Sequence, residues 1–552
     1  MNALIILTYL LGVLICGRLF FLSVIRHDFY LAKANIQQSL ADAQMFSRGD
    51  IFLENRQGEF YPLAINKAWP LAYVEPKKIK NTDLVILART LSSILKIDEN
   101  SLLNKISDKN DPFEILKHEL SAEEAEAIKN LHIDGIGTQM EENLRYYPAK
   151  NLACHVVGFL GYQDDQRVGQ YGVEEFYNDI LTTQKVDANP SKELKEGEDL
   201  VLTVDPNIQL FIEEGLEKIA KNYNAAGGTV IVMDPRNGKI MAMANYPDFD
   251  PNEYSEVKDF DIFINSAVSS VFEPGSVFKP IMMSIALDQG IVSPASTYYD
   301  EGFVKIGGYT IYNATKQAFG TQTMTQVLEK SLNTGIVYVE KLLKQSVITK
   351  YFQDYGFGKK TSIDLPGETN GNIINLESGR DINFATAAFG QGIAVTPIQL
   401  IRAIGAIANK GELVKPTIIE RVIKDDKIQE EVMDASTSTS VQQVISIDTA
   451  NRLTAMLVSV TENGTGKRAK IPGYWIALKT GTAQIPAADK KGYSEETIHS
   501  VVGFAPAYDA RFAILIKLDR PQGVRFAETS ITPFFRDIAE YLLNYLEIPS
   551  ER

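Results

Sequence analysis

Ser276 and Lys279 lie three residues apart, directly after the break that Pro274 and Gly275 impose on the chain. If a helix begins at this break, the two side chains share one face within hydrogen-bonding reach. A serine hydroxyl is a poor nucleophile near neutral pH, so a serine enzyme needs a base fixed beside it. Lys279 can be that base if burial or nearby cations keep it neutral. The stretch therefore predicts nucleophilic catalysis and a fold that buries a lysine beside a serine.

Two later motifs distinguish this Ser-x-x-Lys from the copies at 93–96 and 255–258, which are typical of solvated helix faces. Ser331-Leu332-Asn333 follows Ser276 by 55 residues. Lys479-Thr480-Gly481-Thr482 follows Ser331 by another 148 residues. A single Ser-x-x-Lys is weak evidence, but the ordered set of three motifs is specific.

The ordered set resembles that of class B penicillin-binding proteins, which are monofunctional peptidoglycan D,D-transpeptidases. The likeness extends over nearly the whole chain, and Phe46–Phe52 resembles the entry to the family's pedestal domain. It implies an α/β (α+β) protein with the penicillin-binding transpeptidase fold, a five-stranded antiparallel sheet between helices. An elongated α+β pedestal and one transmembrane helix are expected before it. The expected ranges are 1–25 for the anchor, 47–199 for the pedestal and 200–548 for the transpeptidase domain.

Composition excludes several other classes of protein. The chain has 552 residues, too many for one hydrophobic core, so two or more domains are expected. Its net charge of −15 argues against a nucleic-acid partner, which would need a basic surface. Five scattered histidines and two distant cysteines offer no metal-ligand spacing, so we expect neither a metal nor a cofactor. Only His499 falls within the catalytic stretch, which leaves a histidine-based triad as a minor alternative.

An apolar run from Ala3 to Ile25 is 23 residues long, enough to cross the core of a bilayer. A cleaved signal peptide is the competing interpretation, but the run has no basic start and no Ala-x-Ala-like site after it. We therefore predict an uncleaved anchor. Basic residues follow the run rather than precede it, opposite to a simple positive-inside count. We infer the orientation from function instead, with the catalytic domain on the extracytoplasmic side of the cell membrane.

Local patterns predict the main elements of both domains. Helical periodicity extends from Asp83 to Leu131, with a capping box at 121–124. Asp205-Pro206 is typical of a helix start, and Thr532-Pro533 is predicted to cap a closing helix. A hairpin is predicted at 235–238. The five predicted strands are Thr229–Asp234, Lys239–Ala244, Gly473–Leu478, Ser500–Phe504 and Phe512–Leu518.

The glycine-rich stretches at 389–392 and 463–466 lack the lysine and the strand-to-helix context of a phosphate-binding loop. We therefore exclude nucleotide binding. By resemblance, the first stretch falls where similar proteins have a structural turn beside the active site, and neither stretch is assigned catalytic residues.

The resemblance implies a role for each motif residue. Ser276 would attack the carbonyl between the two terminal D-alanines of a stem peptide, and Lys279 would take its proton. Ser331 would relay that proton to the leaving nitrogen. The remaining implied groups are Asn333 for the peptide amide, Lys479 with Thr480 and Thr482 for the carboxylate, Gly481 for close approach of a peptide to the strand edge, and the backbone N–H groups of Ser276 and Thr482 as oxyanion hole.

The motifs are more similar to those of the septal, division-specific branch than to those of the elongation branch. An elongation-type transpeptidase remains open, as do a non-turnover β-lactam receptor or division scaffold and a β-lactamase. The expected ligands are stem peptides and β-lactams. The expected partners are other division proteins and a membrane-embedded glycan polymerase, contacted through the anchor and the pedestal between Ser47 and Asp199. Gly12 and Gly17 would let a second membrane helix approach the anchor closely.

Overall fold

The computed structural model describes residues 48–552, apart from 81, 110, 164–165, 183, 186–193, 196, 425–426, 429–440 and 488–491. The chain divides into two compact units. Unit 1 contains 65–146 and 182–197, and unit 2 contains 50–64, 147–181 and 198–552. Each unit has its own buried hydrophobic cluster. The domain ranges expected from the sequence stay a prediction.

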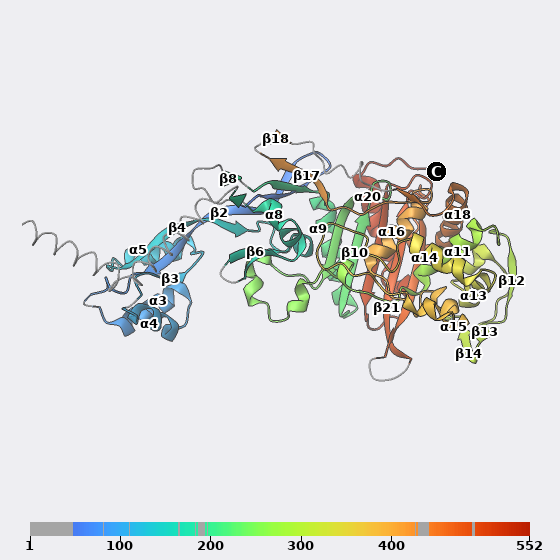
Figure 1. Ribbon diagram of the computed structural model, residues 1–552, viewed down its shortest axis with the longest axis horizontal. Coiled ribbons are helices and arrows are strands. Elements are labelled where there is room, and N and C mark those ends of the chain that lie inside the picture. The colour runs from blue at the N-terminus through green and yellow to red at the C-terminus, as the bar shows by residue number, and fades with distance from the viewer. Residues whose placement is uncertain are drawn as a thin grey trace, which may run out of the picture. The chain divides into compact units, whose positions relative to one another are not determined.

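Unit 1 combines three helices with a small antiparallel sheet (Figure 1). The second half of β2 (Phe60–Val74) pairs with β4 (Ile136–Tyr146) and β3 (Glu114–Lys117). The helices are α3 (Leu84–Leu95), α4 (Glu99–Ser107) and α5 (Ala122–Asn130), and the short strands β7 (Gln184–Lys185) and β8 (Leu194–Lys195) pair with each other. The capping box predicted at Ser121 and Glu124 is confirmed. The unbroken helical prediction over 83–131 missed β3, because four residues are too few to show a period.

Unit 2 also contains a smaller sheet and several short elements apart from the catalytic motifs. The first half of β2 pairs with β1 (Ile51–Glu54), followed by β9 (Asp199–Leu202), β17 (Ile419–Lys424) and β18 (Lys427–Ile428). The short elements are α6 (Cys154–Val157), β5 (Phe159–Gln163), β6 (Gln166–Gln170), α7 (Gly172–Phe176) and α8 (Asn178–Leu181). These residues carry none of the three motifs.

The main sheet of unit 2 is five-stranded and antiparallel, as predicted, in the order β11-β10-β22-β21-β20. Figure 1 shows β10 beside strands from the end of the chain. The strands are β11 (Ile240–Tyr246), β10 (Gly227–Met233), β22 (Phe512–Asp519), β21 (Tyr493–Ala505) and β20 (Ala477–Pro486). The hairpin predicted at 235–238 joins β10 to β11. The strand predicted at Gly473–Leu478 was misplaced: Gly473 has a φ of +88° in a turn, and β20 begins at Ala477 and contains the whole third motif.

One face of this sheet is covered by α9 (Pro206–Asn222) and α20 (Thr532–Tyr545). Asp205 caps α9 by accepting hydrogen bonds from the N–H groups of Asn207 and Ile208, which confirms the predicted start. The predicted cap of α20 was wrong by one residue. Ile531 is the cap, while Thr532 is the first helical residue and its hydroxyl donates to the carbonyl of Ala527.

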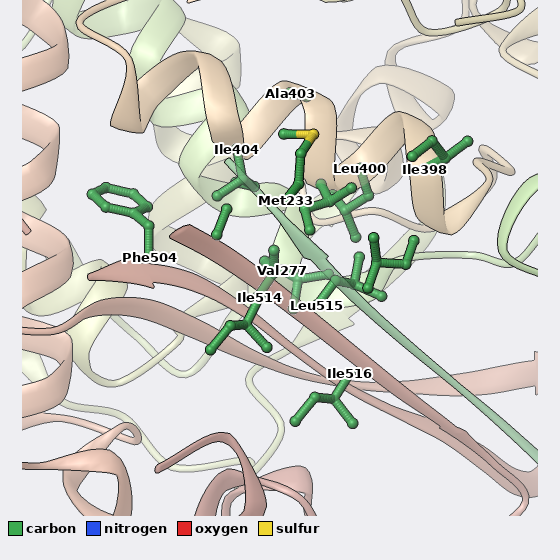
Figure 2. Packing of buried hydrophobic residues seen from close by; sticks show 14 of the residues in the cluster. Met233, Val277, Ile398, Leu400, Ala403, Ile404, Phe504, Ile514, Leu515 and Ile516 are labelled. Atoms are coloured by element: carbon green, nitrogen blue, oxygen red, sulfur yellow. The ribbon is translucent and has the colours of Figure 1, made fainter. Parts of the chain in front are cut away.

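The opposite face is covered by α16 (Pro397–Ala408), and the turn that carries Ser276 packs against β20 and β21. Figure 2 shows Met233 of β10 between Ala403 of α16 and the strands, with Leu515 on the same side of β22. A Cβ added to Gly405 would lie 2.7 Å from Met233 Cε, so α16 packs closely on the sheet. Because side chains alternate along a strand, Ile514 and Ile516 point instead to the face covered by α9 and α20. Both faces of the sheet are therefore covered, and β20 is one of its two edge strands.

The remaining α-helices and strand pairs of unit 2 include α11 and α13, which begin at the motif residues Lys279 and Asn333. The helices are α10 (Ser266–Ser269), α11 (Lys279–Asp288), α12 (Met324–Glu329), α13 (Asn333–Lys341), α14 (Gln345–Asp354), α15 (Asp381–Ala387), α18 (Ile447–Asn463) and α19 (Ala527–Ser530). The strand pairs are β12 (Thr297–Asp300) with β15 (Gly320–Thr323), β13 (Phe303–Ile306) with β14 (Tyr309–Tyr312), and β16 (Glu412–Leu413) with β19 (Gln442–Gln443).

Within the described ranges, no helix combines the length and the apolar composition needed to cross a bilayer. The predicted anchor at residues 1–25 lies outside the described residues.

Candidate active site

The first motif begins in a short 3₁₀ turn, η4 (Gly275–Phe278), rather than in an α-helix, and α11 begins at Lys279. In a 3₁₀ turn, side chains three residues apart are eclipsed. The turn therefore places Ser276 and Lys279 on one face, as the spacing predicted. Ser276 is half-buried, and among the described side chains none forms a hydrogen bond with its hydroxyl. That hydroxyl is available to react.

The glycine-rich stretch at 389–392 supports the turn that carries Ser276. The Gly275 N–H donates to the carbonyl of Gly390 at 2.9 Å. A Cβ on Gly390 would lie 2.3 Å from the Gly275 carbonyl oxygen, and the φ of Gly390 is +76°. The Gly392 N–H donates to the Glu273 carboxylate at 3.0 Å. Only glycine allows the two backbones to approach so closely, so this stretch has the structural role expected from the resemblance.

Lys279 brings the first two motifs together. Its side chain is fully buried, and Nζ donates to the Ser331 carbonyl at 2.6 Å and to Asn333 Oδ1 at 2.8 Å. Ser331 Oγ lies 3.2 Å from the same nitrogen. Burial lowers the pKa of Lys279 well below its ordinary value, and the positive charge of Lys479 lowers it further. The site thus supplies the neutral amine that a general base requires.

Lys479 extends from β20 and joins the same cluster. Its Nζ donates to Ser331 Oγ at 3.0 Å and to the carbonyl of Thr480 at 2.9 Å. Burial lowers the pKa of Lys479 to about 7, against a smaller opposite effect from Glu528. The Ser331 hydroxyl therefore lies between the two lysines. Its oxygen accepts from Lys479, and its proton can point to Lys279, because the two N–H groups of a neutral Lys279 already serve the Ser331 carbonyl and Asn333.

Ser331 lies between α12 and α13 with a φ of +55°, in the left-handed region that few residues other than glycine adopt. Such a conformation costs on the order of 1–3 kcal/mol and persists only where the surroundings impose it. Here the Ser331 N–H donates to the Leu328 carbonyl, and the Ser331 carbonyl accepts from Lys279. The strained residue is held so that both its carbonyl and its hydroxyl face the lysines.

Thr480 and Thr482 do not join this cluster. They lie on the face of β20 opposite Lys479, because side chains alternate along the strand. The Thr480 hydroxyl donates to Thr465 Oγ1 at 2.9 Å, and Thr482 Oγ1 accepts from the Ala527 N–H at 3.1 Å. Thr465 was missed by the sequence analysis, although it belongs to the glycine-rich stretch at 463–466.

Gly481 is needed for a reason that the sequence analysis did not identify. The resemblance implies that Gly481 allows a peptide to approach the strand edge, which stays a prediction. A Cβ there would also lie 2.6 Å from Ser500 Oγ, 3.0 Å from Val277 and 3.2 Å from the Pro274 carbonyl. The absent side chain therefore lets β20 pack against the turn that carries Ser276. The outer edge of β20 has no neighbouring strand among the described residues.

His499 is part of the hydrophobic packing rather than of the cluster. It is fully buried on the face that holds Thr482, where its Nδ1 forms a 2.7 Å hydrogen bond with Ser530 Oγ. Burial lowers its pKa to about 4. The geometry gives it no contact with Ser276, so a histidine-based triad has no support.

Two families of known proteins match the chain. The penicillin-binding protein transpeptidase domain matches residues 228–540, and the penicillin-binding protein dimerisation domain matches residues 46–189. Stage V sporulation protein D of Bacillus subtilis is 33% identical over 89% of this chain and 77% of its own length. The peptidoglycan D,D-transpeptidase FtsI of Escherichia coli K12 is 28% identical over 96% of this chain and 89% of its own.

The fold is also similar to that of solved structures. Penicillin-binding protein 3 from Mycobacterium tuberculosis, complexed with aztreonam, superimposes with a TM-score of 0.71 at 25% identity. The similarity covers 92% of this chain and 98% of that one. The form without ligand has a TM-score of 0.68 at 30% identity, over 74% and 92% of the two chains.

Proposed function

This chain belongs to the penicillin-binding protein transpeptidase family, and from that premise we propose that it is a serine-type peptidoglycan D,D-transpeptidase that β-lactams inhibit. The observation that carries the proposal is the convergence of the three motifs on Ser331. Its carbonyl and hydroxyl contact Lys279, and its hydroxyl also contacts Lys479. Such a cluster is suited to moving a proton between a nucleophile, a base and a leaving group.

In the proposed first step, Ser276 Oγ attacks the carbonyl between the two terminal D-alanines of a donor stem peptide. Neutral Lys279 takes the hydroxyl proton. The backbone N–H groups of Ser276 and Thr482 stabilise the oxyanion. As the C–N bond breaks, the proton passes through Ser331 to the leaving D-alanine nitrogen. An acyl-enzyme ester remains, and an acceptor amine attacks it to form the cross-link and release Ser276.

The free edge of β20 is the proposed binding site for the extended donor peptide, which would add to the sheet as a further strand. The positive charge of Lys479 attracts the donor carboxylate. Thr480 and Thr482 are proposed to bind the same carboxylate, which requires their hydroxyls to exchange the present contacts with Thr465 and Ala527. Asn333 is proposed to hold the peptide amide. β-Lactams would enter the same site and form a stable acyl-enzyme.

The proposed cellular role is cross-linking during septal wall synthesis. Two similar proteins carry the name peptidoglycan D,D-transpeptidase FtsI. The one from Escherichia coli matches 96% of this chain, and the one from Buchnera aphidicola matches 97%. The first relative above, a sporulation protein, supports a specialised role in wall assembly over one in elongation. An elongation-type enzyme and a β-lactam receptor without turnover are the alternatives. The apolar run at residues 3–25 supports a single-pass anchor. The catalytic unit is proposed to lie outside the membrane because its peptidoglycan substrate is there.

The first test is whether Ser276 is the acylated residue. Ser276→Ala should abolish covalent labelling by a fluorescent penicillin, because Ser276 is the motif serine on the same face of the turn as Lys279, whereas the hydroxyl of Ser331 is held by Lys479. Intact-protein mass spectrometry would measure the adduct, and circular dichroism would verify the fold. Ser255→Ala, which alters a copy of the same local spacing, should label normally. Labelling of the Ser276→Ala protein would show that the nucleophile is another residue.

The two lysines should respond differently to arginine. Lys279→Arg keeps the charge but loses the base, so the acylation rate should fall on the order of 10²–10⁴-fold.

The pH dependence of acylation should have two limbs. Lys479 has to be charged to attract a carboxylate, and its pKa is about 7, so acylation efficiency should fall as the pH rises above about 7. On the acid side, efficiency should fall as the pH drops through the lowered pKa of Lys279. Stopped-flow acylation over a range of pH measures both limbs.

Lys479→Arg should move the alkaline limb to higher pH, because arginine stays charged. Lys517→Arg is the matched control, since Lys517 is a buried lysine of the same sheet paired with Asp519. It should leave both limbs in place. An alkaline limb that Lys479→Arg does not move would exclude Lys479 as its origin.

We propose a membrane-embedded glycan polymerase as partner, contacted through residues 1–25 and 47–199. A transpeptidase needs nascent strands near its site, and tethering in one membrane raises the effective concentration of both enzymes. Reconstitution with lipid-linked precursor should give no glycan polymer from this protein alone and increased synthesis when the polymerase is added. Polymerisation by the protein alone, or unchanged polymerase activity without co-purification, would contradict this partnership.

A further inference from the structure

The Asn333 amide lies between Lys279 and the backbone of a neighbouring strand. Its Oδ1 accepts from Lys279 Nζ at 2.8 Å, while its Nδ2 donates to the carbonyl of Tyr312 at 2.9 Å. Turning the amide over would point its oxygen at the Tyr312 carbonyl oxygen, which would lose that hydrogen bond and set two acceptors against each other. The Tyr312 carbonyl therefore determines which end of the amide faces Lys279.

Asn313 ties this carbonyl to the helix that carries Asn333. Tyr312 is the last residue of β14, and the next residue, Asn313, is 2% exposed. Asn313 Oδ1 accepts from the N–H of Thr334 at 3.2 Å and lies 3.1 Å from the Thr334 hydroxyl. Thr334 follows Asn333 in the first turn of α13. The hydrogen bond between Asn313, which follows Tyr312, and Thr334, which follows Asn333, thus fixes the position of Tyr312 relative to Asn333.

Asp300, 1% exposed, is the centre of this arrangement. Its carboxylate accepts hydrogen bonds from the N–H of Gly302 (3.0 Å), the N–H of Phe319 (3.0 Å), the amide of Asn313 (3.0 and 3.1 Å) and the hydroxyl of Thr334 (2.6 Å). An ionised carboxylate has about four acceptor sites, so these donors saturate it. Two of the donors belong to the residues that follow Tyr312 and Asn333.

The energetics of this carboxylate suggest a role other than stability. No lysine or arginine of the described chain forms an ion pair with Asp300, so hydrogen bonds alone compensate for its burial. A buried charge is costly, and apolar packing of the same volume often stabilises a fold at least as well. What a saturated carboxylate provides is fixed geometry for four groups from separate segments.

We propose that Asp300 is a positioning residue for acyl transfer. By holding Asn313 and Thr334 together, it fixes the Tyr312 carbonyl. That carbonyl orients the Asn333 amide so that its oxygen faces Lys279. The inference rests on the proposed function, because it assigns Asp300 an effect on the base of that reaction.

Asp300→Asn tests the proposal with almost no change in volume. The substitution replaces one acceptor oxygen by an NH₂ group that faces donors, so the arrangement should loosen and Asn333 should lose its orientation. Misplacement of a group that contacts the base lowers rates by up to roughly 10²-fold. We therefore expect the acylation rate constant with penicillin to fall by about tenfold to hundredfold. Because Asn333 is also proposed to hold the peptide amide, the dissociation constant of the noncovalent complex should rise, but by a smaller factor than the acylation rate constant falls.

Asp364→Asn is the matched control. Asp364 is also buried in unit 2, where it accepts hydrogen bonds from Thr417 Oγ1 at 2.7 Å and Lys415 Nζ at 3.1 Å, and it has no link to Asn333. The control should acylate at the wild-type rate. If Asp300→Asn does not fold, Thr334→Val removes the hydroxyl that contacts Asp300 and Asn313 at nearly constant volume, and the same loss of rate is expected.

A double-mutant cycle distinguishes positioning from a general structural effect. If Asp300 acts through Asn333, then Asp300→Asn should cause no further loss of rate in a protein that already carries Asn333→Ala. Additive losses, or a folded Asp300→Asn protein that acylates at the wild-type rate, would overturn the proposal. Failure of the wild-type protein to acylate at Ser276 would instead overturn the proposed function.

Discussion

The Ser331 hydroxyl lies within hydrogen-bonding distance of two buried lysines, and the rest of the site depends on this contact. The distances of 3.2 and 3.0 Å mean that the two nitrogens lie within about 6 Å of each other. Two unit charges at that separation repel by about 3 kcal/mol at an effective dielectric constant of 20. Since burial already disfavours both charges, the pair is most stable with one amine neutral. Lys279, more strongly affected, is the one that loses its proton.

The fold provides what this contact needs. The sheet between two helical layers places Lys479 in a buried position, and the missing side chain of Gly481 lets β20 pack against the turn of Ser276. Gly390 holds that turn from the other side through the Gly275 N–H. The strain at Ser331 is maintained by the same lysine that it contacts. Backbone packing and catalytic chemistry are therefore parts of one arrangement.

The residues that carry chemistry could be predicted from the sequence, because the ordered set of three motifs resembles that of a known family. Lys279, Ser331, Asn333 and Lys479 do meet in the structure. What could not be predicted is how they are supported. Asp300, the Tyr312 carbonyl and the contact of Gly390 with Gly275 act across long sequence separations and leave no local pattern. The boundaries of β20 were misplaced because its polar second half, Lys479–Gln484, lacks the apolar alternation of a covered strand.

Whether Lys279 is the neutral base of the site can be measured from its protonation state. The ¹³C resonance of Lys279 Cε, labelled in the full chain and assigned by its loss in the Lys279→Arg protein, would be followed over a range of pH. If Lys279 is the neutral base, the midpoint of this titration should lie well below the ordinary lysine pKa of about 10.4. It should rise when Lys479→Gln removes the neighbouring charge. A midpoint near 10.4, or one that Lys479→Gln does not change, would contradict this role.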